Sequence, residues 1–191
     1  MTERSGTAAI SERARATIRP YRAVDHAAAR RLWAELTNEH LDLYPAPVGS
    51  GGAATAGDGG DADPGAAFEE YLARIDLSGV WVADDPGVGV IGLAGLILRG
   101  RVGEVEPVVI TADRRGEGIG RALLGHVAEQ ARNRGLTALT ISPAARNLAA
   151  IRCLHAAGYD ALSAIELTLD LTRRRREWRD GVEFQDLRFR F

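Results

Sequence analysis

A cluster of glycines and arginines in the middle of the chain has the composition of an anion-binding turn. In the segment RRGEGIGRALL, Gly116, Gly118 and Gly120 follow an apolar stretch and precede a helical pattern. Glycine allows a tight turn and lets a ligand approach the backbone closely. The N–H groups of such a turn and the positive end of the following helix attract phosphate. The segment therefore predicts a pyrophosphate-binding corner. Three arginines around it supply cations suited to phosphate: Arg114, Arg115 and Arg121.

Two other phosphate-binding loops do not fit this segment. A P-loop ends in Gly-Lys-Ser or Gly-Lys-Thr, and all 24 basic residues of the chain are arginine. A dinucleotide fingerprint requires Gly-x-Gly-x-x-Gly, but the third position is Leu123 or Arg121, depending on the starting glycine.

The elements that must hold this corner alternate between strand and helix patterns. An apolar stripe at helical spacing begins after Gly118 and ends before Gly135. Residues 136–141 have the pattern of a strand buried on both faces, and Asn147 can cap a second helix that stops at Gly158. Strands are also expected at residues 17–22, 79–83, 88–98, 104–110 and 159–171, and helices at residues 25–36 and 66–75. This order predicts an α/β fold with a mixed central β-sheet and helices on both faces.

The chain divides into one domain with two tails. We expect a flexible tail at residues 1–16, a domain at 17–171 and an extension at 172–191. Within the domain, residues 48–65 have the Gly, Ala and Asp content of a mobile loop. The end of the extension, VEFQDLRFRF, alternates like an extra strand. Its aromatic residues either dock on the domain or form an intermolecular strand, which would give a homodimer.

Composition excludes several classes of protein. The 191 residues are 46% hydrophobic and carry a formal net charge of −2, which argues against nucleic acid as the partner. The single Cys153 excludes an intramolecular disulfide and a cysteine metal cluster. No apolar run is long enough for a signal peptide or a membrane span. A soluble, cytoplasmic domain without membrane or nucleic-acid partners is expected.

Two motifs in register resemble those of the GNAT N-acetyltransferases. RGEGIG, residues 115–120, is similar to the Gln/Arg-x-x-Gly-x-Gly/Ala signature of this family. NLAAIRCLHAAGY, residues 147–159, is similar to its second signature. The spacing and the order of elements also match over residues 18–171. The resemblance implies the GNAT fold, acetyl-CoA as acyl donor, and transfer of the acetyl group to a small-molecule or peptide amine.

The same resemblance implies which residues hold the coenzyme. Three strand residues would pair their backbone with the pantetheine arm, namely Val108, Val109 and Ile110. The pyrophosphate would lie on Arg115, Gly116, Glu117, Gly118, Ile119, Gly120 and Arg121. Asn147 would contact the coenzyme from the next helix.

Acyl transfer to an amine also needs a base, because an alkylamine with a pKa near ~10 is protonated at neutral pH. Glu104 and Glu106 are two apart on the expected strand, so they share a face at ~6–7 Å unless a bulge intervenes. The resemblance implies an acidic base on this strand, with Glu104 as the first candidate and Glu106 as the second. Alternatively, both are solvated or bind the positive charge of the acceptor.

One position departs from the family pattern. Many members carry a tyrosine four residues before the glycine of the second signature, where it protonates the leaving thiolate. This chain has Leu154 there, which cannot donate a proton. A thiolate is a good leaving group, so an enzyme remains the first interpretation. The alternative is a non-catalytic acyl-CoA-binding sensor or interaction module of the same fold.

Overall fold

The computed structural model describes residues 16–43, 63–169, 171 and 180–190, and its centre is a mixed five-stranded sheet. The strand order is β1-β2-β3-β4-β5. The first four strands are antiparallel, and β5 joins parallel to β4. Their bounds are β1 Thr17–Pro20, β2 Val80–Asp85, β3 Gly89–Arg99, β4 Val102–Ile110 and β5 Ala138–Thr140.

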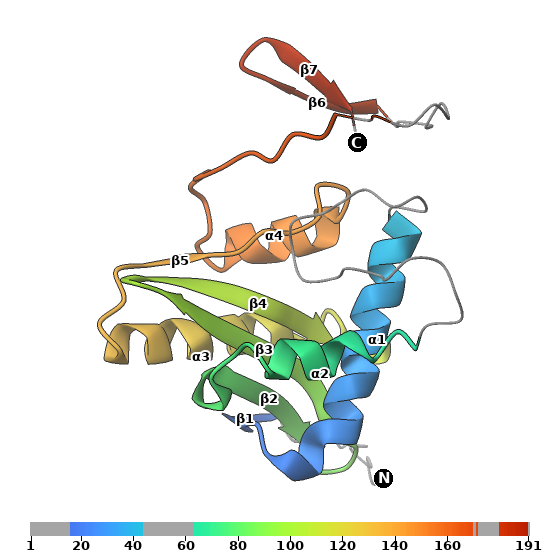
Figure 1. The fold of residues 1–191 in the computed structure, drawn as a ribbon, viewed down its shortest axis with the longest axis vertical. Coiled ribbons are helices and arrows are strands. Elements are labelled where there is room, and N and C mark those ends of the chain that lie inside the picture. The colour runs from blue at the N-terminus through green and yellow to red at the C-terminus, as the bar shows by residue number, and fades with distance from the viewer. Residues whose placement is uncertain (1–15, 44–62, 170, 172–179, 191) are drawn as a thin grey trace, which may run out of the picture.

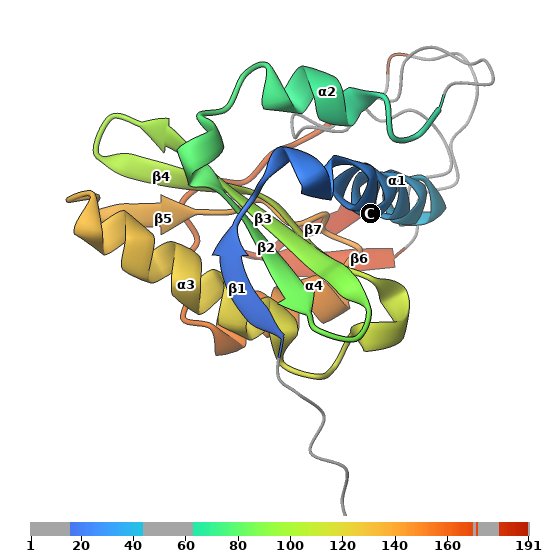
Figure 2. The same cartoon turned by 90° about the horizontal axis from the view of Figure 1, so that it is seen from below.

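Helices cover both faces of this sheet (Figure 2). Helices α1 (His26–Leu43) and α2 (Ala67–Leu72) lie on one face. Helix α3 (Ile119–Asn133) lies on the other, and α4 (Leu148–Ala156) packs beside it. The predicted α/β class, with a mixed sheet between helical layers, is confirmed.

Each helical layer buries its own apolar cluster against the sheet. The predicted stripe of α3 is buried as expected and consists of Ile119, Leu123, Leu124, Val127 and Ala131. On the other face, Trp33, Phe68 and Tyr71 are almost fully buried. The Trp33 and Tyr71 ring centroids are 4.8 Å apart. Burial of such large rings on one side and aliphatic side chains on the other fixes which face each helix presents to the sheet.

A bulge in β4 changes which face its side chains occupy. Leu96 of β3 pairs with Val105, but Ala94 pairs with Val108, so β4 has one extra residue between these pairs. Consequently Val105 packs in the α3-side cluster, whereas Val109 packs in the α1-side cluster. Without the bulge, an even spacing would place both on one face.

Residues 136–141 were predicted to form a strand buried on both faces, and this prediction of burial was wrong. The strand β5 is shorter than expected, Ala138 is exposed, and Leu139 and Thr140 are only half-buried. The physical reason is that β5 is the last strand of the sheet, so no neighbour covers its outer edge.

The chain after α4 also differs from expectation. Residues 159–169 form no strand, although their alternation predicted one or two. Further on, the alternating C-terminal segment forms not one strand but a hairpin, β6 (Asp180–Phe184) and β7 (Leu187–Arg190). The hairpin turns at Gln185 and Asp186, which have φ of 53° and 62°. It forms a sheet of its own (Figure 1).

The expected tail at residues 1–16 and the expected loop at residues 48–65 lie mostly outside the described residues, which exclude residues 1–15 and 44–62. The last residues of that loop are described: the Asp63 carboxylate pairs with Arg30 and accepts a 2.9 Å hydrogen bond from the Gly65 N–H. Within the described residues, no helix is both long and apolar enough to cross a membrane.

Helix α1 is preceded by a 3-10 turn, Ala23–Asp25, of which Asp25 is the last residue. Its carboxylate is buried and accepts hydrogen bonds of 2.7 and 2.8 Å from the Arg19 guanidinium and 2.8 Å from the Arg22 N–H. The hydrogen bonds from Arg19 lower the pKa of Asp25, although burial opposes them. This ion pair holds β1 to the start of α1.

The Asp25 carboxylate should make stability depend on pH. Because its folded pKa lies below the ordinary value of 3.8, its contribution is present above that value and is lost as pH falls through the folded pKa. We expect Asp25→Asn to lower the free energy of unfolding by about 1–3 kcal/mol at pH 7 and by less at acid pH. Urea unfolding at both pH values measures this. The exposed Asp160→Asn is the matched control, and an equal loss at both pH values would contradict the ion-pair account.

Candidate functional site

The predicted corner between strand and helix is present and open. Strand β4 ends at Ile110, a 3-10 turn spans Ala112–Arg114, and α3 starts at Ile119. Gly116 and Gly118 have φ of 80° and 84°, which favours glycine at both positions. A Cβ added at either glycine would meet no atom within 4 Å. The corner therefore has space for a ligand against its backbone.

Unpaired N–H groups face this space at the start of α3. The first hydrogen bond of the helix is donated by the Ala122 N–H to the Gly118 carbonyl, at 3.0 Å. The N–H groups of Ile119, Gly120 and Arg121 thus have no acceptor inside the helix. At Gly120, an added Cβ would meet only Ile110 and Cys153 atoms at 3.8 and 3.9 Å, which is ordinary contact. This arrangement of donors at a positive helix end can bind a phosphate group.

The arginines around the corner have different roles. The Arg114 guanidinium is bound by Asp85 at 2.9 Å and by Glu117 at 3.0 Å. Arg115 donates a 2.9 Å hydrogen bond to the Ile110 carbonyl and pairs with Glu39 at 2.9 Å. Both side chains brace the turn. Of the three arginines, Arg121 alone is exposed without an ion pair to any residue that the structure describes.

Two glutamates of α1, which sequence reasoning missed, attach the turn to that helix. The Glu35 carboxylate accepts hydrogen bonds from Thr111 Oγ1 at 3.2 Å and from the Ala112 N–H at 3.3 Å. Glu39 lies one helical turn further on and holds Arg115. Their spacing of four residues indicates a shared helix face. That spacing does not indicate contacts with residues such as Thr111, which lies more than 70 residues away in sequence.

The strands β4 and β5 part before they reach the corner. They pair only from Val102, opposite Ala138, to Glu104, opposite Thr140. Beyond that point, Val108, Val109 and Ile110 pair with β3 on one edge. Their other edge has no strand partner in the described part of the chain. An unpaired strand edge offers alternating N–H and C=O groups to an extended amide-containing chain.

The two candidate bases occupy unequal environments. The Glu104 carboxylate is paired with the Arg99 guanidinium at 3.1 Å. Glu106 lies at the bulge, where burial raises the pKa of its carboxyl and the negative charge of Glu104 raises it further. The Tyr71 hydroxyl fixes the backbone here by donating a 2.6 Å hydrogen bond to the Glu106 carbonyl. The pKa of Glu106 is thus shifted toward neutral pH.

The beginning and end of α4 show how its predicted site residues lie. The Asn147 side chain accepts a 2.9 Å hydrogen bond from the Ala150 N–H, so it caps α4 as predicted. Leu154 is buried in the α3-side cluster. The Tyr159 hydroxyl is buried and has no hydrogen-bond partner among the described residues, and burial raises the pKa of this phenol.

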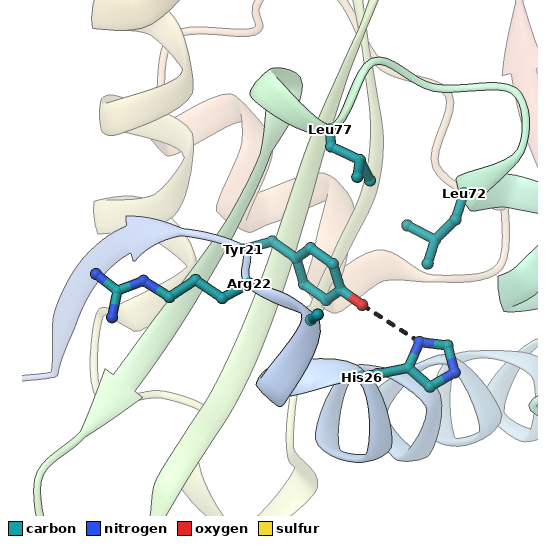
Figure 3. A pocket seen from close by; sticks show the side chains of 6 residues that line it. Tyr21, Arg22, His26, Leu72 and Leu77 are labelled. Atoms are coloured by element: carbon teal, nitrogen blue, oxygen red, sulfur yellow. Dashed lines mark hydrogen bonds between the residues drawn. The ribbon is translucent and has the colours of Figure 1, made fainter.

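A shallow hollow of about 290 Å³ lies elsewhere, between β1, α1 and α2 (Figure 3). It is lined by Tyr21, Arg22, Ala23, His26, Leu72 and Leu77. The Tyr21 N–H donates to the Val80 carbonyl at 2.9 Å, at the start of β2. The corner is next to the other end of β2, where Asp85 holds Arg114. The hollow is therefore at the opposite end of the sheet and contains none of the predicted site residues.

With this geometry, the comparisons with known proteins identify the family. Residues 33–159 match the model of the acetyltransferase (GNAT) family. This match covers the central sheet from β2 onward, the corner and α4, and the chain therefore belongs to the GNAT acetyltransferase family.

A curated relative shares part of this region. Glucosamine 6-phosphate N-acetyltransferase 1 of Oryza sativa subsp. japonica is 40% identical over 78 residues, which cover 37% of this chain and 47% of that protein. The chain thus spans about half the length of the curated relative that it matches.

Solved structures share the fold. YncA of Salmonella typhimurium, solved with its cofactor acetyl-CoA, is 26% identical with a TM-score of 0.53 and covers 76% of this chain and 79% of that one. The ribosomal-protein-alanine N-acetyltransferase of Brucella melitensis is 24% identical with a TM-score of 0.55, covering 74% and 83%. The similarity to the Brucella melitensis enzyme is evidence for a shared fold alone.

The attachment of the turn to α1 can be tested with Glu35→Ala. Loss of a charged acceptor should cost about 1.5–3 kcal/mol locally and speed amide exchange at Ala112 by about 10- to 100-fold. Hydrogen exchange followed by NMR or mass spectrometry measures this. Glu129→Ala, at an exposed position on α3, serves as the control and should leave the turn unchanged. Equal exchange in both variants would mean that Glu35 does not hold the turn.

Proposed function

We propose that this protein is an N-acetyltransferase that takes the acetyl group from acetyl-CoA and transfers it to an amine. The observation that carries this proposal is the continuity of two features. The unpaired edge of β4 leads directly into an open corner with three free N–H groups. The extended pantetheine chain of the coenzyme would lie along the β4 edge, and the pyrophosphate that follows it would lie in the corner. Family membership and the acetyl-CoA complex of YncA support it.

Each predicted coenzyme residue has a role in this proposal. Val108, Val109 and Ile110 offer backbone groups to the pantetheine amides. The turn at residues 115–120 supplies backbone N–H groups, and Arg121 supplies an exposed positive charge for the pyrophosphate. Arg115 and Glu117 act through their backbone, because their side chains brace the turn. Asn147 positions α4 beside the coenzyme through its cap.

We propose Glu106, rather than Glu104, as the base. It takes a proton from the ammonium group of the acceptor, directly or through water. The nitrogen lone pair then attacks the thioester carbonyl carbon and forms the C–N bond. The C–S bond breaks, coenzyme A leaves as a thiolate, and the nitrogen releases its remaining extra proton to water to give the amide. Burial and the nearby charge of Glu104 raise the pKa of Glu106, which makes its carboxylate a stronger base, whereas the Glu104 carboxylate is already paired with the Arg99 guanidinium. Buried Leu154 donates no proton, so solvent protonates the thiolate.

The acceptor is a primary amine whose identity stays open between a small molecule and a peptide. The rice relative is named for glucosamine 6-phosphate, an amino sugar phosphate. The alternative function, a non-catalytic acyl-CoA-binding module, is favoured by one observation, the replacement of the family's tyrosine by buried Leu154. Incubation with acetyl-CoA and a panel of amines, followed by detection of free thiol, separates the two. Binding without thiol release across the panel would support the module.

The corner can be tested with two glycine-to-alanine variants, one at the N-cap residue of α3 and one inside the same helix. Gly118→Ala forces a Cβ onto a backbone with φ of 84° and should weaken acetyl-CoA binding by about tenfold or more, because the turn must change conformation. Gly125→Ala lies on the exposed side of α3 and should leave binding unchanged while raising stability slightly. Calorimetric titration with acetyl-CoA measures both affinities. Equal affinity in the two variants would place the coenzyme elsewhere.

The base can be assigned with Glu106→Gln and Glu104→Gln. Glu106→Gln should lower kcat by about 10²- to 10⁴-fold with acetyl-CoA affinity intact. In the unaltered enzyme, kcat should rise with pH through the raised pKa of Glu106. Glu104→Gln removes a neighbouring negative charge, so it should move this rise to lower pH without abolishing activity. The opposite pattern, with Glu104→Gln inactive and Glu106→Gln active, would restore Glu104 as the base.

A further inference from the structure

A tyrosine hydroxyl lies where the pairing of β3 and β4 is interrupted. The register of the two strands shifts between Ala94 and Leu96, and Gly95 has no paired residue in this ladder. At this point the Tyr71 hydroxyl of α2 donates a 2.6 Å hydrogen bond to the Glu106 carbonyl of β4. A side chain from the helical layer thus supplies a hydrogen bond to a bulge that the strands leave irregular.

Glycine at position 95 leaves the space that this hydroxyl needs. A Cβ added at Gly95 would overlap both the Tyr71 hydroxyl and the Glu106 carbonyl oxygen. Glycine inside a strand is ordinarily unfavourable, because it loses more conformational entropy than other residues and adds no side chain to the packing. The close approach of the hydroxyl is a physical reason for glycine at this position.

The ring that carries the hydroxyl is held by its neighbours. Tyr71 is 1% exposed, and its ring centroid is 4.8 Å from that of Trp33 and 6.2 Å from that of Phe68. Burial and the charge of Glu106 raise the already high pKa of the phenol, so it keeps its proton and remains a donor. The hydroxyl is therefore a preorganised donor, which can fix a carbonyl without first being ordered itself.

Fixing this carbonyl also restricts where the carboxylate of the same residue lies. Burial is the largest cause of the raised pKa of Glu106, and the charge of Glu104 adds to it. Two cations oppose the shift, Arg74 just after α2 and Arg99 of β3. A turn of the Glu106 backbone would move its carboxyl relative to these charges and to water. The hydrogen bond from Tyr71 resists that turn.

We propose that Tyr71 is a positioning residue, whose hydroxyl holds the β4 bulge so that the Glu106 carboxylate meets the incoming amine. This inference rests on the proposed function, in which Glu106 takes a proton from the acceptor. Tyr71 acts through the Glu106 carbonyl and not by contact with the reacting atoms. The base then depends on a helix that lies 35 residues earlier in the sequence and packs on one face of the sheet.

Tyr71→Phe tests this role, because it removes the hydroxyl and keeps the ring. The fold should be preserved by circular dichroism, and kcat should fall by about 10- to 100-fold with acetyl-CoA affinity unchanged, because the base is misplaced. A freed Glu106 carboxyl is better hydrated, so the rise of kcat should move to lower pH. Tyr21→Phe is the matched control. It removes a hydroxyl that lies 3.2 Å from His26 Nδ1, and it should change neither kcat nor the pH profile.

Two further measurements distinguish positioning from a general loss of structure. A variant with both Tyr71→Phe and Glu106→Gln should lose no more activity than Glu106→Gln alone, because the hydroxyl acts through Glu106. NMR titration of the Glu106 carboxyl should give a lower pKa in Tyr71→Phe than in the unaltered protein.

An additive loss of activity in the double variant would overturn the proposal, and so would an unchanged kcat and an unchanged Glu106 pKa in Tyr71→Phe. Full activity of Glu106→Gln would reject the base and, with it, this role of Tyr71. If no amine is acetylated, the proposed function fails. The NMR titration then decides by itself whether the hydroxyl controls the Glu106 carboxylate.

Discussion

The parting of β4 from β5 is the constraint on which the arrangement of the site depends. The bulge after Val105 adds one residue to β4, and the parallel pairing with β5 ends at Glu104, just before it. This geometry has three results. The backbone of residues 108–110 keeps a free edge, Glu106 lies half-buried at the point of separation, and β4 leads through the glycine turn to the unpaired N–H groups at the start of α3. A regular β4–β5 ladder would occupy the edge that an extended substrate needs.

The sequence predicted the local features of this region because their causes are local. The turn depends on glycines at positions 116 and 118, whose backbone conformations few other residues adopt. The Asn147 cap and the stripe of α3 follow from short-range hydrogen bonding and helical spacing. Both family signatures lie in these local elements, which is why the fold class and the GNAT family could be predicted.

Features that depend on distant residues could not be predicted in this way. Arg115 was expected to face the pyrophosphate, but its partner Glu39 comes from a helix 76 positions earlier in the sequence. The choice of Glu106 over Glu104 as the candidate base depends on the bulge in β4 and on the ion pair of Glu104 with Arg99. The periodicity of the sequence reveals neither feature. Burial of β5 was overestimated because an apolar strand pattern does not tell whether the strand has a neighbour on both of its edges.

The pairing of Arg114 and Arg115 with carboxylates also determines how an anion meets this protein. Local positive charge around the turn is largely cancelled by Asp85, Glu117 and Glu39, in a molecule whose formal net charge is already −2. Little long-range attraction remains to guide a polyanion from solution. Capture therefore depends on short-range contact with backbone dipoles, whose fields fall off within a few ångströms. Association should consequently be slow compared with electrostatically steered encounters and only weakly sensitive to ionic strength.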